Sequence, residues 1–281
     1  MRTKPAMRAA KSDPMVGFPP ILVDGEPISA DDLTYLALVN YGAYTSFRVE
    51  DGAVRGLDLH LARLEASAVE LFGQSPGEAR LRALMRTAVA DRTDGWLRVS
   101  LFSPEIWART PSWRGVPRVM TMAAEPPSPL ASAVRLTSQA YVRDATHLKH
   151  TALFGLIRAR RLARHDGFDD ALFVNDQGLI SEGSLWNIGF VQGDHVVWPQ
   201  APMLAGVTQA LIERGLADVG LTSETRPLGL DALAGFDHAF LCNSATPACV
   251  VTAIDGHVLG VDPDLIERLT RAWASNNPQT I

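Results

Sequence analysis

The stretch most diagnostic of the fold is His147-Leu148-Lys149-His150-Thr151, which joins an expected strand to an expected helix. It contains the only lysine beyond the first dozen residues, because just three of the 26 basic residues are lysines and the others are Lys4 and Lys11. Arginine can replace lysine at most ion-pair positions, but it stays protonated and cannot supply a neutral amine. Lys149 is therefore a candidate for amine chemistry, with codon bias as the alternative explanation.

The surroundings of Lys149 favour a neutral amine. The expected strand covers residues 134–142, and the expected helix runs from about residue 151 to residue 165 and is closed by Gly167. The positive end of that helix disfavours an ammonium group, and partial burial acts in the same direction. A free amine is what Schiff-base chemistry requires. An ordinary surface lysine before a helix is the competing interpretation.

Downstream of Lys149 the sequence predicts a barrel-like sheet. Short apolar strands are expected at 171–174, 179–181, 186–191, 195–198 and 236–242, with a helix at about 207–214. Tight turns at 175–178 and 192–194 join neighbouring strands. Strands connected in this way pair mostly antiparallel.

Upstream of Lys149 the pattern is mixed. Hairpins are expected around Asp24-Gly25 and Asp51-Gly52. Apolar residues repeat at helical spacing from Leu57 to Leu71, so a helix should end near Gly73. A second helix is expected at 78–91, with strands at 96–102 and 118–123. Hairpins combined with two helices predict an α+β fold.

A proline-rich stretch divides the chain. Three prolines fall within residues 126–129 and exclude helix and interior strand there. We therefore expect two domains: a small α+β domain at 16–125, a linker at 126–135 and a larger domain at 136–281. Residues 1–15 are basic and without pattern, so we expect a flexible leader.

Composition excludes several classes of protein. The 281 residues are 47% hydrophobic with a net charge of −5, which argues against disorder and against a nucleic-acid binder. The two cysteines, Cys242 and Cys249, cannot build a disulfide framework, so a reducing, cytoplasmic setting is expected. No apolar run approaches the roughly 18 residues of a membrane span, so no membrane partner is expected.

Common catalytic motifs are missing from the sequence. It has no G-x-G-x-x-G after a strand, no P-loop, no H-E-x-x-H and no G-x-S-x-G. His147 and His150 could form a metal pair, but no third ligand is evident, so no metal is expected.

Three further segments accompany Lys149. Residues 180–187 place Glu182 where a strand ends against glycine, and residues 204–208 open a helix with a small-residue turn whose amides and Thr208 hydroxyl could bind an anion. In His60-Leu61-Ala62-Arg63-Leu64, Arg63 lies off the apolar stripe. Considered separately, Glu182 could be an ordinary carboxylate in a turn, residues 204–208 an ordinary helix cap and Arg63 an arginine exposed to solvent.

Together the four segments resemble the class IV aminotransferase family, the fold-type-IV pyridoxal-phosphate enzymes. This family includes branched-chain aminotransferases, D-amino-acid transaminases and aminodeoxychorismate lyases. The resemblance runs from about Ile21 to Gly256, with Lys149, 182–187, 206–208 and His60-x-x-Arg63 in the family's order and spacing.

The resemblance implies roles for individual residues. Lys149 resembles the catalytic lysine that carries the cofactor covalently and moves the substrate proton. Glu182 resembles the carboxylate that faces the pyridine nitrogen, with Asn187 behind it. The residues that would bind the phosphate are Arg63, Val207, Thr208 and Ser244. Tyr44 and Arg98 resemble substrate-binding residues.

Departures from the family leave the subfamily open. The branched-chain enzymes have a tyrosine five residues after the lysine, where this chain has Phe154. The arginine of the D-amino-acid transaminases and the lyases falls at or near Leu101, whereas Arg98 matches the branched-chain enzymes. The usual arginine after Gly-Ile-Thr is replaced by Gln209.

The resemblance implies a two-domain enzyme that binds pyridoxal 5'-phosphate and transfers an amino group from an amino acid or amine to a 2-oxo acid. A pyruvate-releasing lyase of the aminodeoxychorismate type and a non-catalytic cofactor carrier are the alternatives. A homodimer is implied as well.

Overall fold

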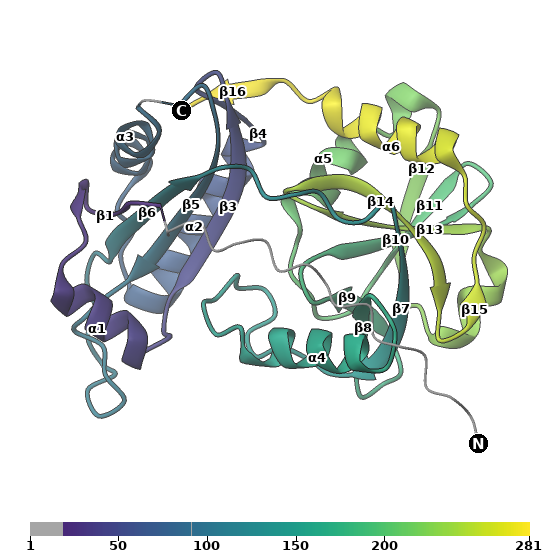
Figure 1. Ribbon diagram of the computed structural model, residues 1–281, viewed down its shortest axis with the longest axis horizontal. Coiled ribbons are helices and arrows are strands. Elements are labelled where there is room, and N and C mark those ends of the chain that lie inside the picture. Colours follow the sequence, from purple (N-terminus) through teal and green to yellow (C-terminus); the bar gives the residue numbers. More distant parts are fainter. Residues whose placement is uncertain (1–18, 91) are drawn as a thin grey trace.

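The computed structural model describes residues 19–90 and 92–281, so the predicted leader at 1–15 lies outside the described residues. Within these ranges the chain forms two sheets. The first sheet carries helices α1 to α3 and the second carries α4 to α6, and we call these units the first and the second lobe (Figure 1). The predicted α+β class is confirmed.

The first sheet is antiparallel, in the order β16-β4-β3-β5-β6-β1-β2. Its strands are β1 (Ile21–Val23), β2 (Glu26–Pro27), β3 (Ala43–Glu50), β4 (Ala53–Arg55), β5 (Asp94–Phe102), β6 (Arg118–Ala124) and β16 (Pro278–Thr280). The predicted turns Asp24-Gly25 and Asp51-Gly52 are present, and all four residues have positive φ. Such turns match the twist of the strands that they join.

Helices α2 (Leu57–Phe72) and α3 (Glu78–Val89) cover one face of this sheet. The predicted stripe of α2, including Leu57, Leu61 and Leu64, is buried in the core of the first lobe. Gly73 ends α2 in the left-handed conformation, with φ of 86°. The opposite face of the sheet is left free to meet the second lobe.

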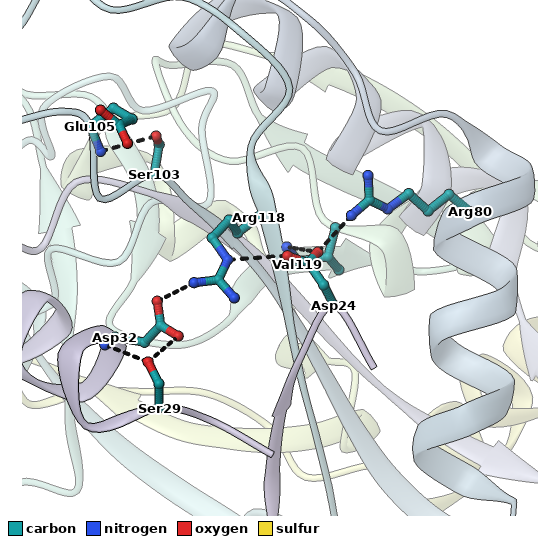
Figure 2. Close-up of polar contacts among 8 residues, drawn as sticks. All are labelled: Asp24, Ser29, Asp32, Arg80, Ser103, Glu105, Arg118 and Val119. Carbon is teal, nitrogen blue, oxygen red and sulfur yellow. Dashed lines mark hydrogen bonds and ion pairs between the residues drawn. The ribbon is translucent and has the colours of Figure 1, made fainter. Parts of the chain in front are cut away.

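Helix α1 (Ala30–Leu38), which the sequence interpretation missed, is attached to the first sheet by a cluster of polar contacts (Figure 2). Ser29 Oγ caps the helix by accepting from the Asp32 N–H at 3.1 Å. Arg118 donates to Asp24 at 3.1 Å and pairs with buried Asp32, while Arg80 of α3 reaches Asp24 at 2.9 Å. The cluster therefore joins α1, α3 and β6 to the first hairpin.

The second sheet has the order β12-β11-β10-β13-β14-β7-β8-β9, and β15 pairs with β14. Its strands are β7 (Ala133–Ala140), β8 (Asp170–Val174), β9 (Ile180–Gly183), β10 (Asn187–Gln192), β11 (His195–Pro199), β12 (Thr222–Arg226), β13 (His238–Asn243), β14 (Thr246–Ile254) and β15 (His257–Val258). Pairing is antiparallel between most neighbours, as predicted, but it is parallel for β7 with β8, β7 with β14 and β11 with β12. Helices connect β7 to β8 and β11 to β12, and such crossovers produce parallel pairs.

The second lobe contains α4 (Phe154–His165), α5 (Val207–Gly215), α6 (Pro263–Ala274) and the short 3₁₀ turns η1 (Ala217–Val219) and η2 (Leu230–Gly235). Helices α5 and α6 pack together over a core that contains Trp198, Phe240 and Leu269. Asp262 caps α6 by accepting from the N–H groups of Asp264 and Leu265. This packing fixes the position of α5, whose first residues face the other lobe.

The chain crosses between the lobes twice, at residues 125–132 and again at 275–277, after which β16 pairs with β4 (Figure 1). The side chain of Ile281 is buried in the core of the first lobe. The domain boundaries expected from the sequence remain a prediction. The pairing of β16 with β4 places residues 278–280 in the first lobe.

Candidate functional site

Lys149 lies in the loop between β7 and α4, and this loop runs alongside the start of β3. The Lys149 carbonyl accepts a hydrogen bond from the Tyr44 N–H at 2.8 Å, and the Thr151 N–H donates to the Gly42 carbonyl at 2.9 Å. A Cβ at Gly42 would lie 2.4 Å from the Leu101 carbonyl oxygen, so only glycine permits this close approach to β5 at the start of β3. The loop therefore holds Lys149 between the two lobes.

The Lys149 amine is poised to lose its proton near neutral pH. Its pKa falls from 10.5 to about 7, mainly because of burial. The positive charges of Arg63 and Arg143 act in the same direction, and Glu182 opposes them. The amine lies 5.1 Å from the centroid of the Tyr44 ring. Burial and neighbouring arginines therefore favour a neutral amine.

Glu182, the residue before the end of β9, is a buried carboxylate with two partners. Its Oε1 atom accepts from Arg143 Nε at 2.9 Å, and its Oε2 atom accepts from the Leu204 N–H at 3.3 Å. Asn187, at the start of β10, donates from Nδ2 to the Leu204 carbonyl at 2.9 Å. Glu182 and Asn187 thus hold the same residue, which leads into α5.

The start of α5 offers backbone donors to the same space. This helix begins at Val207, after Gly206, with no side-chain cap and no acidic residue in its first turn. Thr208 is buried there. Free N–H groups at the positive end of a helix form a binding site for an anion.

Ser244 lies in the tight turn between β13 and β14. The Asn243 side chain holds this turn, because its Oδ1 atom accepts from the N–H groups of Ala245 at 3.0 Å and Thr246 at 2.9 Å. The turn therefore presents Ser244 beside the start of α5.

Arg63 reaches across from α2 and donates to the Ala205 carbonyl. Burial lowers its pKa to about 10, so it remains charged at neutral pH. The first lobe thus contributes a cation to the anion-binding end of the site.

Tyr44 and Arg98 lie on the free face of the first sheet. The Arg98 guanidinium carbon is 3.7 Å from the centroid of the Tyr44 ring, and Arg98 Nε donates to Ser100 Oγ at 3.2 Å. Burial lowers the pKa of Arg98. Stacking on the ring and the bond to Ser100 leave the terminal nitrogens of Arg98 available as a fork for a carboxylate.

One cavity brings together predicted residues from both lobes. Those that line it are Tyr44, Arg63, Lys149, Glu182, Asn187, Val207, Thr208 and Ser244. Arg98 is not among the lining residues; it stacks on the ring of Tyr44 instead.

The sequence interpretation missed Arg143, His150 and Asn243, which line the same cavity. Arg143 is buried and pairs with Glu182. Its position six residues before Lys149 was the available signal, but an isolated arginine does not stand out in a chain this rich in arginine. The Asn243 amide makes local turn contacts, which are common for asparagine.

Two positions that differ from the family lie away from the cavity. Phe154 begins α4 with its side chain 78% exposed, whereas Leu153 and Leu156 line the cavity. Leu101 is fully buried in the core of the first lobe, on the face of β5 opposite to Arg98 and Ser100. An arginine at position 101 would therefore point away from the site, so the comparison at Leu101 carries no weight.

The two histidines beside Lys149 have ordinary partners. His147 Nε2 lies 2.9 Å from a Glu70 carboxylate oxygen, and His150 Nε2 lies 3.0 Å from the Asp144 carbonyl oxygen. Among the described residues, no group of three or more His, Cys, Asp or Glu side chains could hold a metal ion. In the same part of the chain, none of the helices has the length and hydropathy needed to span a membrane.

The arrangement suits a dianionic ligand with an electrophilic carbon. Arg63, Arg143 and Lys149 line the cavity, Arg98 lies directly behind it, and Glu182 is the only carboxylate among the described lining residues. An anion at the start of α5 would offset this positive charge. The neutral form of Lys149 could bond to a carbonyl carbon at the other end of the same ligand.

Comparison with known proteins agrees with this chemistry. Residues 42–254 match the family model described as amino-transferase class IV. A D-alanine aminotransferase of Bacillus licheniformis is 25% identical over 232 residues, covering 78% of this chain and 81% of that protein. An aminodeoxychorismate lyase of Bacillus subtilis is 22% identical over 241 residues, covering 78% and 79%.

A probable branched-chain-amino-acid aminotransferase of Synechocystis is 31% identical over 113 residues. That match spans 40% of this chain and 37% of the cyanobacterial protein, so it covers only part of each. The crystal structure of a branched-chain aminotransferase from Thermoproteus uzoniensis has the same fold. Its TM-score is 0.79 at 21% identity, covering 92% of this chain and 94% of that one.

Proposed function

Because the chain belongs to the class IV aminotransferase family, whose members use pyridoxal phosphate, we propose that it transfers an amino group between a carboxylate-bearing amino acid and a 2-oxo acid. The observation that supports this most directly is the cavity in which Lys149, with a pKa of about 7, meets Glu182 and an uncapped helix start. These are the groups that an aldehyde, a ring nitrogen and a phosphate require.

The residues present fit the cofactor. Lys149 would bond to its aldehyde carbon, and the start of α5 with Arg63 and Ser244 would bind its phosphate. Bound there, pyridoxal phosphate supplies a ring that takes up electrons from the substrate carbon. The positive charge of the site offsets the charge of the phosphate.

The protein's own groups would divide the remaining work. The Lys149 amine, freed when substrate binds, would carry a proton between the substrate carbon and the adjacent cofactor carbon. The Glu182 carboxylate would keep a proton on the ring nitrogen, because a buried negative charge favours the protonated ring. The hydrogen bonds between the loop and β3 keep Lys149 at a buried position, which would limit the access of water to its amine.

Arg98 and Tyr44 would position the substrate. Arg98 lies at a partly buried site without a carboxylate partner in the described structure, and its terminal nitrogens suit a carboxylate. The substrate is therefore proposed to carry a carboxylate close to Tyr44.

The experiment is a single-turnover titration of the purified holoprotein with amino acids and amines, followed by the near-visible absorbance of the cofactor. A transaminase should lose this band with an amino donor alone and recover it when a 2-oxo acid is added. A band that persists while aminodeoxychorismate yields pyruvate would establish the lyase. No change with any donor in a broad screen would leave only a cofactor carrier.

We also propose a homodimer in the reducing cytoplasm. Apolar side chains on and beside α4 are exposed, including Phe154 at 78% and Ile157 at 54%, together with Leu185. Exposed apolar surfaces of this kind support protein association. Both cysteines are buried and free, which fits a reducing compartment. Light scattering of wild type and Ile157→Glu would test the dimer.

A further inference from the structure

Arg143 connects the two groups on which the proposed reaction depends. Its side chain is 5% exposed, and its Nε donates to Glu182 Oε1 at 2.9 Å. The other two nitrogens of the same guanidinium donate to backbone carbonyls, Nη1 to Leu148 at 3.1 Å and Nη2 to Thr146 at 2.6 Å. Leu148 is the residue directly before Lys149.

These contacts form a rigid link. A guanidinium is planar and holds its donors in a fixed fork. One side of the fork fixes the carboxylate of Glu182, and the other side fixes the peptide that leads into Lys149. The distance between the carboxylate and the lysine backbone is therefore set by one side chain.

Few other contacts lie within the loop: the Leu148 N–H donates to the Ala145 carbonyl at 2.8 Å, and His150 Nε2 lies 3.0 Å from the Asp144 carbonyl oxygen. Ala145 is in the left-handed region, with φ of 42°, which an alanine adopts at a cost of roughly 1–2 kcal/mol. The contact between His147 and Glu70 is exposed, at 62% and 50% of the two side chains, and exposed polar contacts of this kind contribute little. The contact between Tyr44 and the Lys149 carbonyl fixes only the far end of the loop.

We propose that Arg143 is a positioning residue that aligns the Glu182 carboxylate with the Lys149 amine. This inference rests on the proposed function for its catalytic consequence. The alignment itself is a property of the protein without cofactor.

The position of Arg143 beside Lys149 has an effect that can be measured, because its charge acts on the pKa of the lysine amine. Arg63, Arg143 and Arg98 lower the pKa of Lys149, and Glu182 raises it. Removing Arg143 would take away one of these positive charges and leave the negative charge of Glu182 in place. The pKa of Lys149 should therefore rise.

The experiment compares Arg143→Met and Arg143→Lys with Arg118→Met. Arg118 is the control because it pairs with two carboxylates, Asp24 and Asp32 (Figure 2). It belongs to the first lobe and is not among the residues that line the cavity. The first readout is the pH at which Lys149 in the protein without cofactor becomes reactive to an amine-specific label, followed by mass spectrometry. The second readout is kcat and KM of the holoprotein.

Arg143→Met should move the titration of Lys149 upward from about 7, towards the ordinary lysine value of 10.5. It should also lower kcat by about tenfold to a hundredfold, because small misplacements of reacting groups have effects of that size. Arg143→Lys keeps the charge but cannot reproduce the fork, so it should lower kcat while the Lys149 titration stays near that of wild type. Arg118→Met should change neither readout.

An unchanged Lys149 titration and a kcat within twofold of wild type in Arg143→Met would overturn the inference. If Arg143→Met does not fold, Arg143→Lys decides it, because wild-type kcat in that variant would show that the fork is not needed. The labelling experiment needs no cofactor. Failure of the wild type to bind pyridoxal phosphate at Lys149 would therefore count against the proposed function and leave the alignment test standing.

Discussion

Asn187 occupies the space that a side chain at Gly206 would need. A Cβ on Gly206 would lie 2.0 Å from Asn187 Oδ1, which is far closer than any real contact. Because the Asn187 amide also holds the Leu204 carbonyl, these two residues fix the path by which the chain enters α5. The anion-binding end of the cavity depends on that path.

Gly206→Ala should weaken cofactor binding and destabilise the protein. The methyl group would displace Asn187 or the start of α5, and overpacking of this kind costs about 1–3 kcal/mol. Equilibrium titration with pyridoxal phosphate and thermal unfolding measure the two effects. Gly235→Ala is the matched control, since a Cβ at Gly235 meets nothing within 4 Å. Equal affinity in both variants would contradict the role of Gly206.

Attachment of the cofactor to Lys149 should depend on pH with a midpoint near 7. A protonated amine cannot attack an aldehyde, and the lowered pKa means that the proton is lost as the pH rises through about 7. Stopped-flow absorbance would follow the rate, and borohydride trapping with peptide mapping would identify the lysine. Lys149→Ala should show no covalent attachment. A midpoint close to 10.5 would show that the amine is not perturbed.

Glu182→Gln should lose far more catalysis than cofactor affinity. A neutral amide cannot keep the proton on the ring nitrogen, and one positioned proton-controlling group is worth about 10²–10⁴-fold. Steady-state kcat and the cofactor dissociation constant separate these effects. Glu65→Gln, an exposed change on α2, is the control. A Glu182→Gln enzyme with wild-type kcat would remove Glu182 from the mechanism.

Arg63→Ala should lose more cofactor affinity than catalysis, the opposite of the result expected for Glu182→Gln. It removes a charged donor from the phosphate end, and a hydrogen bond to a charged group is worth about 1.5–3 kcal/mol. Cofactor affinity should therefore fall by about tenfold to a hundredfold, with a smaller effect on kcat at saturating cofactor. Arg158→Ala, an exposed arginine of α4, should bind cofactor normally. Matching profiles for the Arg63 and Glu182 variants would mean that the two roles are wrongly assigned.

Arg98→Met should act mainly on substrates that carry a carboxylate. Loss of the fork removes a charge-assisted contact, so KM for amino acids should rise by about tenfold or more. Amines that lack a carboxylate should lose much less activity than amino acids, which provides the internal control, because for them only the small effect of Arg98 on the pKa of Lys149 is lost. An equal loss for both kinds of donor would place Arg98 outside the substrate site.

Local patterns predicted much of the fold. All the predicted features that depend on near neighbours in the sequence are present: the apolar stripe of α2, the turns at Asp24 and Asp51, and the strands around Glu182. The parallel pairing of β11 with β12 could not be foreseen, because the two strands are brought together through α5. Helix α1 was missed although Ser29 and Asp32 are spaced as a cap, since the segment is short and only partly apolar.

The site was predictable only in part for a similar reason. Lys149 stood out because lysine is rare in this chain, whereas Arg143 was one arginine among many. Its importance depends on the approach of Glu182, which lies 39 residues further along the chain. Contacts of that kind are defined by the packing of β7 and β9 in one sheet and leave no local pattern.

The double crossing of the chain constrains how the two lobes can move. Residues 125–132 form one connection and residues 275–277 the other, and β16 fixes the second by pairing with β4. A rotation of one lobe against the other disturbs these connections least when its axis passes close to both of them. The three prolines in the first connection stiffen one end of that axis.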